Sequence, residues 1–179
     1  RLMAALKAET GGRVRFTGLG GPLMQEQGLQ SLFDTAELAV MGIAEVVKEI
    51  PRILRRIRET TAHAIASRPD VFVSIDSPSF SLEVSQRLRG KGFPLVHYVA
   101  PSVWAWKAWR AKHIAKFLDQ LMTLLPFEPP YFEKHGLAAT FVVFLFAYLN
   151  LNRWHGHFSY GAFVWITGLV LIAGVAVID

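Results

Sequence analysis

The feature that most constrains the fold is the short apolar run Val-Phe-Val-Ser-Ile at residues 71–75, which leads directly into Asp76 and fits a buried strand. Further strand candidates occupy residues 13–17, 95–99 and 118–125. Helical patterns lie between the strand candidates, near residues 43–67, 81–89 and 107–117. Strands separated by helices of crossover length predict a parallel, doubly wound α/β sheet.

Asp76 is the first candidate for chemistry. Ligands of such sheets bind beyond the carboxyl ends of the strands, so we expect a site in the loops that begin at Gly18, Asp76 and Ala100. Pro78 stops the strand and holds a turn, which leaves a carboxylate at the strand end. The alternative is that Asp76 caps the helix that starts near Ser81, or fixes the turn.

Two further loops carry candidate binding residues. Gly20 and Gly21 end a glycine-rich segment that is similar to a phosphate-cradling loop, although the segment lacks the full dinucleotide pattern and a Walker lysine. Ser102, Trp104 and Trp106 follow a strand, where aromatic side chains commonly form a wall for a sugar or an acyl chain. Purely structural roles are the alternatives, because glycines permit tight turns and tryptophans fill gaps between sheet and helix.

No metal site is expected. His97 lies within a strand, where a core histidine is the simplest interpretation, and no second His, Asp or Glu stands near it at metal-ligand spacing. The chain has no cysteine, which excludes disulfides, thiolate metal sites and a cysteine nucleophile. This composition suits a reducing compartment, and the cytoplasm is the default expectation.

Residues 43–58 combine an apolar stripe with a row of cations. The stripe consists of Ile43, Val46, Val47, Ile50, Leu54 and Ile57, and the cations are Lys48, Arg52, Arg55, Arg56 and Arg58. Pro51 should break or kink this helix midway.

An amphipathic helix normally packs its stripe on the sheet. The concentration of cations, with Ile53 outside the stripe, instead indicates that part of the apolar surface faces the headgroups of an anionic membrane. The residues expected at this membrane surface are Val46, Val47, Ile50, Arg52, Leu54, Arg55 and Arg56. Nucleic acid is not an expected partner, because the helix has no stacking aromatics.

The end of the chain is hydrophobic. From Gly136 onward only Arg153 and Asp179 are charged, so the net charge of +5 lies on the first 135 residues. Residues 137–149 would reach only about 20 Å as a helix, short of the roughly 30 Å hydrocarbon core of a bilayer. Residues 158–178 are uncharged and meet the requirement of about 20 residues, so they are the candidate transmembrane segment of a helical tail.

Five blocks of sequence resemble the lipid-A-disaccharide synthase family, glycosyltransferase family 19, in that family's order and spacing. They are GLGGPLM at 18–24, ELAVMGIAEV at 37–46, IDSP at 75–78, HYVAPSVWAW at 97–106 and LLPFE at 124–128. The resemblance implies half of a GT-B fold, in which two Rossmann-like domains face each other across a cleft. Residues 1–141 are then a partial amino-terminal, acceptor-side domain, and residues 142–179 are a hydrophobic tail.

The resemblance also implies an activity. The family transfers 2,3-diacylglucosamine from its UDP derivative to 2,3-diacylglucosamine 1-phosphate, with inversion and without a metal or cofactor. Asp76 matches the family's catalytic carboxylate, which would take the proton of the attacking acceptor hydroxyl. The residues expected to bind substrate are Gly20, Gly21, Met41, Ser102, Trp104 and Trp106. The expected location is the cytoplasmic face of the bacterial inner membrane, peripheral unless the tail spans it, and the sequence neither requires nor excludes a homo-oligomer.

Three departures from the family pattern matter. Ser79 stands where the family has an aspartate, and a glycine-rich segment with an acidic residue and the first strand would precede Arg1. After Val142 the family continues into a nucleotide-binding domain, whereas this chain turns hydrophobic. The chain as written is therefore expected to be inactive alone. The alternatives are a non-catalytic, membrane-anchored remnant, a rearranged or frameshifted fragment, or another GT-B transferase.

Overall fold

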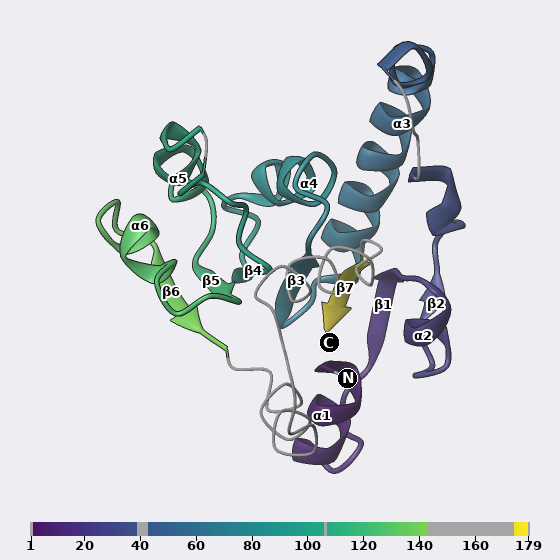
Figure 1. Ribbon diagram of the computed structural model, residues 1–179. Helices are drawn as coiled ribbons and strands as arrows, with labels where there is room; N and C mark the ends of the chain where they lie inside the picture. The colour runs from purple at the N-terminus through teal and green to yellow at the C-terminus, as the bar shows by residue number, and fades with distance from the viewer. Residues whose placement is uncertain (1, 39–42, 106, 143–173, 179) are drawn as a thin grey trace, which may run out of the picture.

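The computed structural model describes residues 2–38, 43–105, 107–142 and 174–178, with side chains described except at 43–48 and 174–178. Its centre is a seven-stranded sheet of order β2-β1-β7-β3-β4-β5-β6 (Figure 1). The strands are β1 Phe16–Leu19, β2 Gln30–Ser31, β3 Val71–Ile75, β4 Leu95–Tyr98, β5 Gln120–Thr123, β6 Ala138–Phe141 and β7 Gly174–Ile178. The prediction of a strand at 71–75 is confirmed to the residue.

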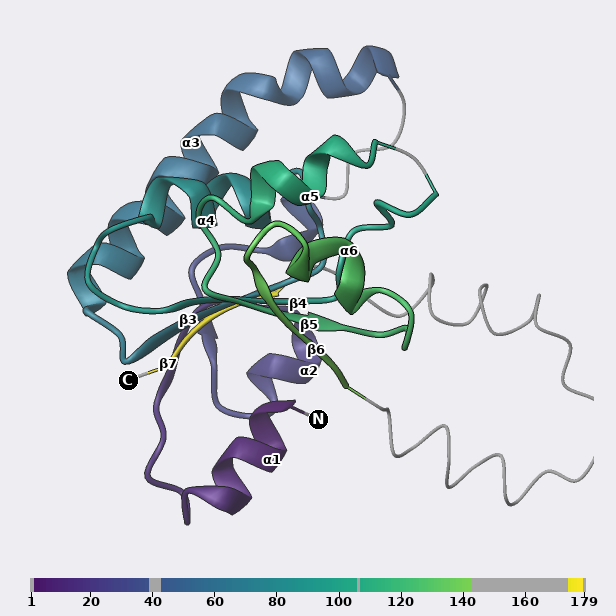
Figure 2. The ribbon, with the colours of Figure 1, turned by 90° about the vertical axis from the view of Figure 1, so that its left-hand side faces the viewer.

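Helices cover both faces of the sheet. They are α1 Leu2–Glu9, α2 Pro22–Gln25, α3 Ile43–Ser67, α4 Ser81–Leu88, α5 Trp109–Ile114 and α6 Pro129–Glu133, with a 3₁₀ turn at Thr35–Leu38. Figure 2 shows α3, α4, α5 and α6 on one face, and α1 and α2 on the other. The doubly wound α/β prediction is therefore confirmed.

Strand β7 corrects the expectation of an all-parallel sheet with a helical tail. Gly174–Ile178 lies between β1 and β3 and pairs antiparallel with both, whereas every other strand pair of the described residues is parallel. These five residues belong to the segment predicted to span a membrane as a helix, but they form a central strand. Residues 158–173 of that segment lie outside the described residues. No helix in the described part of the chain is long and apolar enough to cross a membrane.

Two element boundaries differ from the prediction, whereas the predicted break or kink at Pro51 is a change of helix direction without a break. β1 runs through Gly18 and Leu19, which had been assigned to the glycine-rich loop, because Gly18 pairs with Ser31 of β2. α5 starts at Trp109 and ends at Ile114, inside the predicted 107–117. α3 continues through Pro51, so the helix is not broken there, although Figure 2 shows its axis changing direction.

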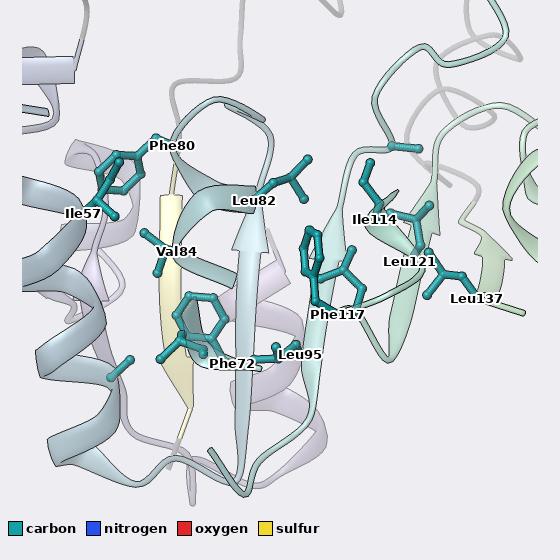
Figure 3. Close-up of a cluster of buried hydrophobic side chains, with 14 of the residues drawn as sticks. Ile57, Phe72, Phe80, Leu82, Val84, Leu95, Ile114, Phe117, Leu121 and Leu137 are labelled. Atoms are coloured by element: carbon teal, nitrogen blue, oxygen red, sulfur yellow. The ribbon is translucent and has the colours of Figure 1, made fainter. Parts of the chain in front are cut away.

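Most of the core lies between the sheet and the α3–α6 layer. Phe72, Leu95 and Leu121 from the strands pack with side chains from the covering helices, among them Ile57 of α3 (Figure 3). A second, smaller cluster on the opposite face joins Met3, Phe16 and Leu29. The two clusters fix the sheet from both sides, and they leave the carboxyl ends of the parallel strands free to carry loops.

Candidate functional site

The loops after β3 and β4 hold backbone in unusual conformations. Asp76, Ser77, Val99 and Lys107 have φ values of 46°, 45°, 77° and 56°. This left-handed region is unfavourable for residues other than glycine, and most of all for a β-branched valine. Such strain costs about 1–3 kcal/mol per residue and gathers at binding and catalytic sites. The carboxyl edge of β3 and β4 is therefore the candidate functional site.

Asp76 stands at the centre of this edge. Its backbone amide donates to the carbonyl of Tyr98 at 2.9 Å, which extends the β3–β4 ladder, and its carbonyl accepts the Ser81 hydroxyl. The carboxyl group is half-buried, and burial raises its pKa, an effect that the Ser77 amide partly opposes. The position after β3 is the predicted one.

The alternative that Asp76 caps α4 is wrong. The N-cap residue of α4 is Phe80, which makes no side-chain capping hydrogen bond. The Asp76 carboxylate instead accepts from the amide of the next residue, Ser77. A role in fixing this turn remains compatible with the geometry, and the turn presents the carboxylate at the edge of the sheet.

Trp104 and Phe127 form an aromatic pair beside the site. Their rings meet edge to face with centroids 5.4 Å apart, and their side chains are 44% and 45% exposed. Trp104 thus does not plug the gap between sheet and helix, which was the structural alternative for it. An exposed, ordered aromatic pair is suited to contact a sugar ring or an acyl chain.

Glu128, which is not among the predicted site residues, holds Trp104 in place. The carboxyl group is buried, accepts from Trp104 Nε1 at 3.3 Å with Oε1, and accepts from the Leu124 and Leu125 amides at 3.1 and 2.9 Å with Oε2. Burial raises the pKa of Glu128. The three hydrogen bonds lower that pKa, but they offset only part of the effect of burial. The presence of Glu128 in the LLPFE block was a signal, but its role depends on contacts that only the fold creates.

The two glycines after β1 have different surroundings. A Cβ atom at Gly20 would lie 2.7 Å from Leu29 Cδ2 and 2.8 Å from Met24 Sδ, and the Gly20 amide already donates to the Ser31 hydroxyl. Packing therefore accounts for Gly20 without a ligand. Gly21 is open, since the nearest atom to its Cβ position is 3.8 Å away. Ser102 is exposed on the loop after β4, and Met41 and Trp106 lie outside the described residues.

The apolar side chains of α3 that were considered for membrane contact are partly exposed and partly buried. Ile50 and Leu54 are 44% and 38% exposed, whereas Ile57 is buried in the core and Ile53 packs against it. Ile53, which had been placed outside the apolar stripe, therefore faces inward, while two stripe residues face outward. The side chains of Val46 and Val47 lie outside the described part. Figure 1 shows the amino-terminal half of α3 rising beyond the other helices.

The arginines of α3 are largely paired. Arg56 donates to Glu37 at 2.7 Å, lies over the Phe33 ring at 4.4 Å and is mostly covered, so it anchors α3 to the chain before it. Arg52 pairs with Glu49 at 2.9 Å. Arg55 pairs loosely with Glu59 at 3.7 Å and keeps 62% of its side chain exposed.

His97 is a core residue, as predicted. It is fully buried, and its Nδ1 lies 2.7 Å from the Ser74 hydroxyl, which also accepts from Ser85. Burial lowers its pKa to about 4, so the ring is neutral at physiological pH. Its Nε2 has no hydrogen-bond partner among the described residues. Within the same part of the chain, no three His, Cys, Asp or Glu side chains come together as metal ligands.

A shallow hollow of about 710 Å³ lies away from this site. It is lined by residues 89, 90 and 92–95 before and within β4 and by the turn from Ala115 to Asp119. These segments lie at the amino ends of β4 and β5, whereas Asp76 lies at the carboxyl end of β3. The strained backbone and the exposed aromatic pair, rather than this hollow, mark the candidate site.

A doubly wound, mostly parallel sheet with helices on both faces defines a Rossmann-like domain, with the candidate site at its carboxyl edge. The family model described as lipid-A-disaccharide synthetase matches residues 1–144. The chain belongs to this family of glycosyltransferases of lipid A biosynthesis.

Individual relatives agree with this family. The lipid-A-disaccharide synthase of Rhodospirillum centenum is 56% identical over 144 residues, which are 79% of this chain and 36% of the relative. That of Paramagnetospirillum magneticum is 51% identical over 139 residues, 76% of this chain and 36% of the relative. That of Pseudomonas putida is 46% identical over 141 residues, 79% of this chain and 37% of the relative. The chain thus spans little more than a third of the length of these relatives.

Proposed function

We propose that the described domain is the acceptor-side half of an enzyme that transfers 2,3-diacylglucosamine, with inversion, from its UDP derivative to 2,3-diacylglucosamine 1-phosphate. The observation that carries the proposal is the strained, half-buried carboxylate of Asp76 at the carboxyl end of β3. Because the chain spans about a third of its relatives, the UDP-binding groups are expected from the part that the match does not cover.

Asp76 is the proposed general base. As the acceptor hydroxyl attacks the anomeric carbon of the donor, it loses its proton to the carboxylate, and UDP departs from the opposite side of that carbon. Burial raises the pKa of Asp76, which makes the carboxylate a stronger base than one in water. The left-handed backbone at Asp76 and Ser77 follows directly after β3, at the carboxyl edge of the sheet.

The other candidate residues are proposed to hold the acceptor. Trp104 and Phe127 offer an exposed aromatic surface for the sugar ring or an acyl chain. Glu128 joins Trp104 to the loop after β5, because it accepts hydrogen bonds from both the Trp104 side chain and the Leu125 amide. Ser102 and Gly21 are accessible on neighbouring loops, and Met41 and Trp106 are carried as proposals from the family resemblance alone.

The acylated substrates place the enzyme at a membrane. We propose peripheral attachment to the anionic, cytoplasmic face of the inner membrane through the exposed part of α3, namely Ile50, Leu54 and Arg55. Arg56 contributes little to such contact, because it is turned toward Glu37 and Phe33.

A chimera tests the catalytic proposal. Residues 1–142 of this chain replace the matching segment of the Rhodospirillum centenum relative, and formation of the disaccharide is measured. The Asp76→Asn change should keep the fold and lower turnover by roughly 10²-fold or more. Turnover equal to that of the unchanged chimera would contradict the role of Asp76 as base.

A non-catalytic remnant is the second candidate, and it is favoured by one observation: the family match ends at residue 144, while the chain continues to Asp179. Both candidates predict that the chain alone forms no disaccharide. An active chimera supports a competent acceptor-side domain, whereas a folded but inactive chimera supports the remnant. Ser79→Asp in that inactive chimera then asks whether the missing carboxylate is the cause.

A further inference from the structure

The outward face of α5 combines an exposed tryptophan with lysines. Trp109, Lys112 and His113 stand at the spacing i, i+3 and i+4, which places them on one side of α5, and Lys116 follows in the turn after the helix. All four are exposed, and Trp109 is 66% exposed. We refer to these four residues as the α5 patch. The inward side of the same segment, Ala111, Ile114 and Phe117, is buried in the core.

The cations of the α5 patch are not neutralised by neighbours. Neither Lys112 nor Lys116 makes an ion pair with an acidic group of the described residues, whereas Arg52, Arg55 and Arg56 of α3 all do. The sequence from residue 103 to residue 118 contains no aspartate or glutamate. The α5 patch therefore carries two exposed lysines that have no ion pair within the described part of the chain.

The aromatic part of the patch is held in a fixed arrangement. His113 lies between Trp109 and the buried Phe117, with ring centroids at 6.5 and 5.7 Å and edge-to-face geometry on both sides. A tryptophan that is supported by its neighbours, and yet presents most of its surface to solvent, is suited to the boundary between lipid headgroups and acyl chains.

Trp109 opens α5 at the edge that carries the site, whereas Lys116 lies in the turn that leads to the amino end of β5. α5 follows β4 and so begins at the carboxyl edge, and α3, which leads into β3, has its amino-terminal half at that edge too (Figure 2). The exposed Ile50 and Leu54 and the start of α5, with Trp109, therefore lie toward the same edge as the loops that carry Asp76 and Trp104.

We propose that the α5 patch is a second membrane-contact surface, which binds the headgroups of anionic phospholipids. Trp109 enters the headgroup region while Lys112 and Lys116 meet the lipid phosphates. Together with α3 it gives a two-point attachment that turns the carboxyl edge toward the bilayer. The inference rests on the proposed function for its choice of a lipid surface. Nucleic acid fits less well, because one accessible tryptophan and two lysines offer neither a row of stacking aromatics nor a cationic groove.

The absence of cysteine allows a local test in the full chain. Trp109→Cys is labelled with a fluorophore that responds to polarity, and the protein is mixed with vesicles of pure phosphatidylcholine or of phosphatidylcholine with phosphatidylglycerol. The matched control is Lys91→Cys, an exposed position in the turn before β4. Because the probe reports on one position, binding through the hydrophobic tail does not imitate contact at α5.

The expected result is a blue shift at position 109, and none at position 91, with the anionic vesicles only, reversed by high salt. Adding Lys112→Gln and Lys116→Gln to the labelled chain should raise the lipid concentration for half of the response by about 30-fold, at roughly fivefold per lysine. The same charge change at Arg89 and Lys91 should alter it by less than about threefold.

Several outcomes would overturn the proposal. They are a probe that does not respond to anionic vesicles, equal effects of the two glutamine pairs, and a stronger response to single-stranded DNA than to the vesicles. Separate failures are distinguishable. Suppose that Ile50→Ser with Leu54→Ser abolishes vesicle binding while the probe at position 109 does not respond. The proposed α3 contact is then supported and the α5 proposal fails. The Asp76 chimera tests catalysis independently of both.

Discussion

Replacing Gly20 by alanine tests whether packing or ligand binding requires a glycine at this position. The added Cβ would meet Leu29 Cδ2 at 2.7 Å, Met24 Sδ at 2.8 Å and Met24 Cβ at 2.9 Å, all closer than real Cβ contacts. The first two atoms end flexible side chains, but the third is fixed to the α2 backbone. Forcing one extra methyl group into such packing costs about 1–3 kcal/mol. We therefore expect Gly20→Ala to lower the free energy of unfolding by that amount.

The neighbouring glycine provides the matched control. At Gly21 the nearest atom to a new Cβ is Thr35 Oγ1 at 3.8 Å, and its φ of −77° is accessible to alanine. Gly21→Ala should be neutral, or should stabilise the fold by up to about 1 kcal/mol, because alanine restricts the unfolded chain. Urea unfolding followed by circular dichroism compares the two variants at equal protein concentration.

The contact with Leu29 can be tested by a double-mutant cycle. Leu29→Ala alone should cost about 2–5 kcal/mol, because Leu29 is buried. Combined with Gly20→Ala, the total loss should be smaller than the sum of the two single losses by about 1 kcal/mol, since the nearest clash is gone. Equal unfolding midpoints for Gly20→Ala and Gly21→Ala, or strict additivity in the cycle, would refute the packing explanation and return Gly20 to the ligand-binding candidates.

Three further predictions concern the site and the core. Burial raises the pKa of Asp76, so the stability it contributes is present below the ordinary value of 3.8 and is lost as the pH rises through the folded-state pKa. Asp76→Asn should therefore gain stability relative to the parent as the pH rises from 3.8 through the raised pKa of Asp76, and a difference that does not change with pH in urea titrations would contradict this. A double-mutant cycle of Glu128→Gln with Trp104→Phe should give a coupling of about 1 kcal/mol, since one hydrogen bond joins the two side chains, and additive losses would show that the bond contributes nothing. Phe72→Ala in the fully buried core should cost about 3–5 kcal/mol, against less than about 0.5 kcal/mol for the exposed Leu23→Ala, and comparable losses would show that the described core is wrong.

Elements with strong local patterns could be predicted from the sequence. β3 was found to the residue because a continuous apolar run bounded by a carboxylate and a proline matches a buried parallel strand. α3 was found because its apolar positions repeat at helical spacing over many residues. The same pattern does not say which half of α3 is covered. Ile57 and Ile50 occupy equivalent positions in the pattern, yet Ile57 is buried in the core and Ile50 is exposed.

Features set by contacts between distant residues could not be predicted. Glycine usually marks a turn, yet Gly18 belongs to β1 because Ser31 of β2 pairs with it. Asp76 was predicted because a strand end is visible in the sequence. Glu128 was missed because its role requires Trp104, 24 residues earlier, to fold back onto it. The position of the proposed base thus follows from a local pattern, whereas the contacts that support the proposed binding surface do not.

β7 shows where hydropathy alone is ambiguous. A central strand and a membrane helix are both runs of apolar residues, and Gly174–Ile178 satisfies either description. The two structures exclude each other, because a helix of residues 158–178 would need those last five residues to reach about 30 Å, and residues 158–173 alone would reach only about 24 Å. Withdrawing β7 would leave β1 and β3 unpaired along four and five registered positions in the middle of the sheet. Each buried backbone group left without a partner costs about 1–3 kcal/mol. A bilayer must therefore supply more than this lost pairing before the end of the chain leaves the sheet, unless another strand takes the place of β7.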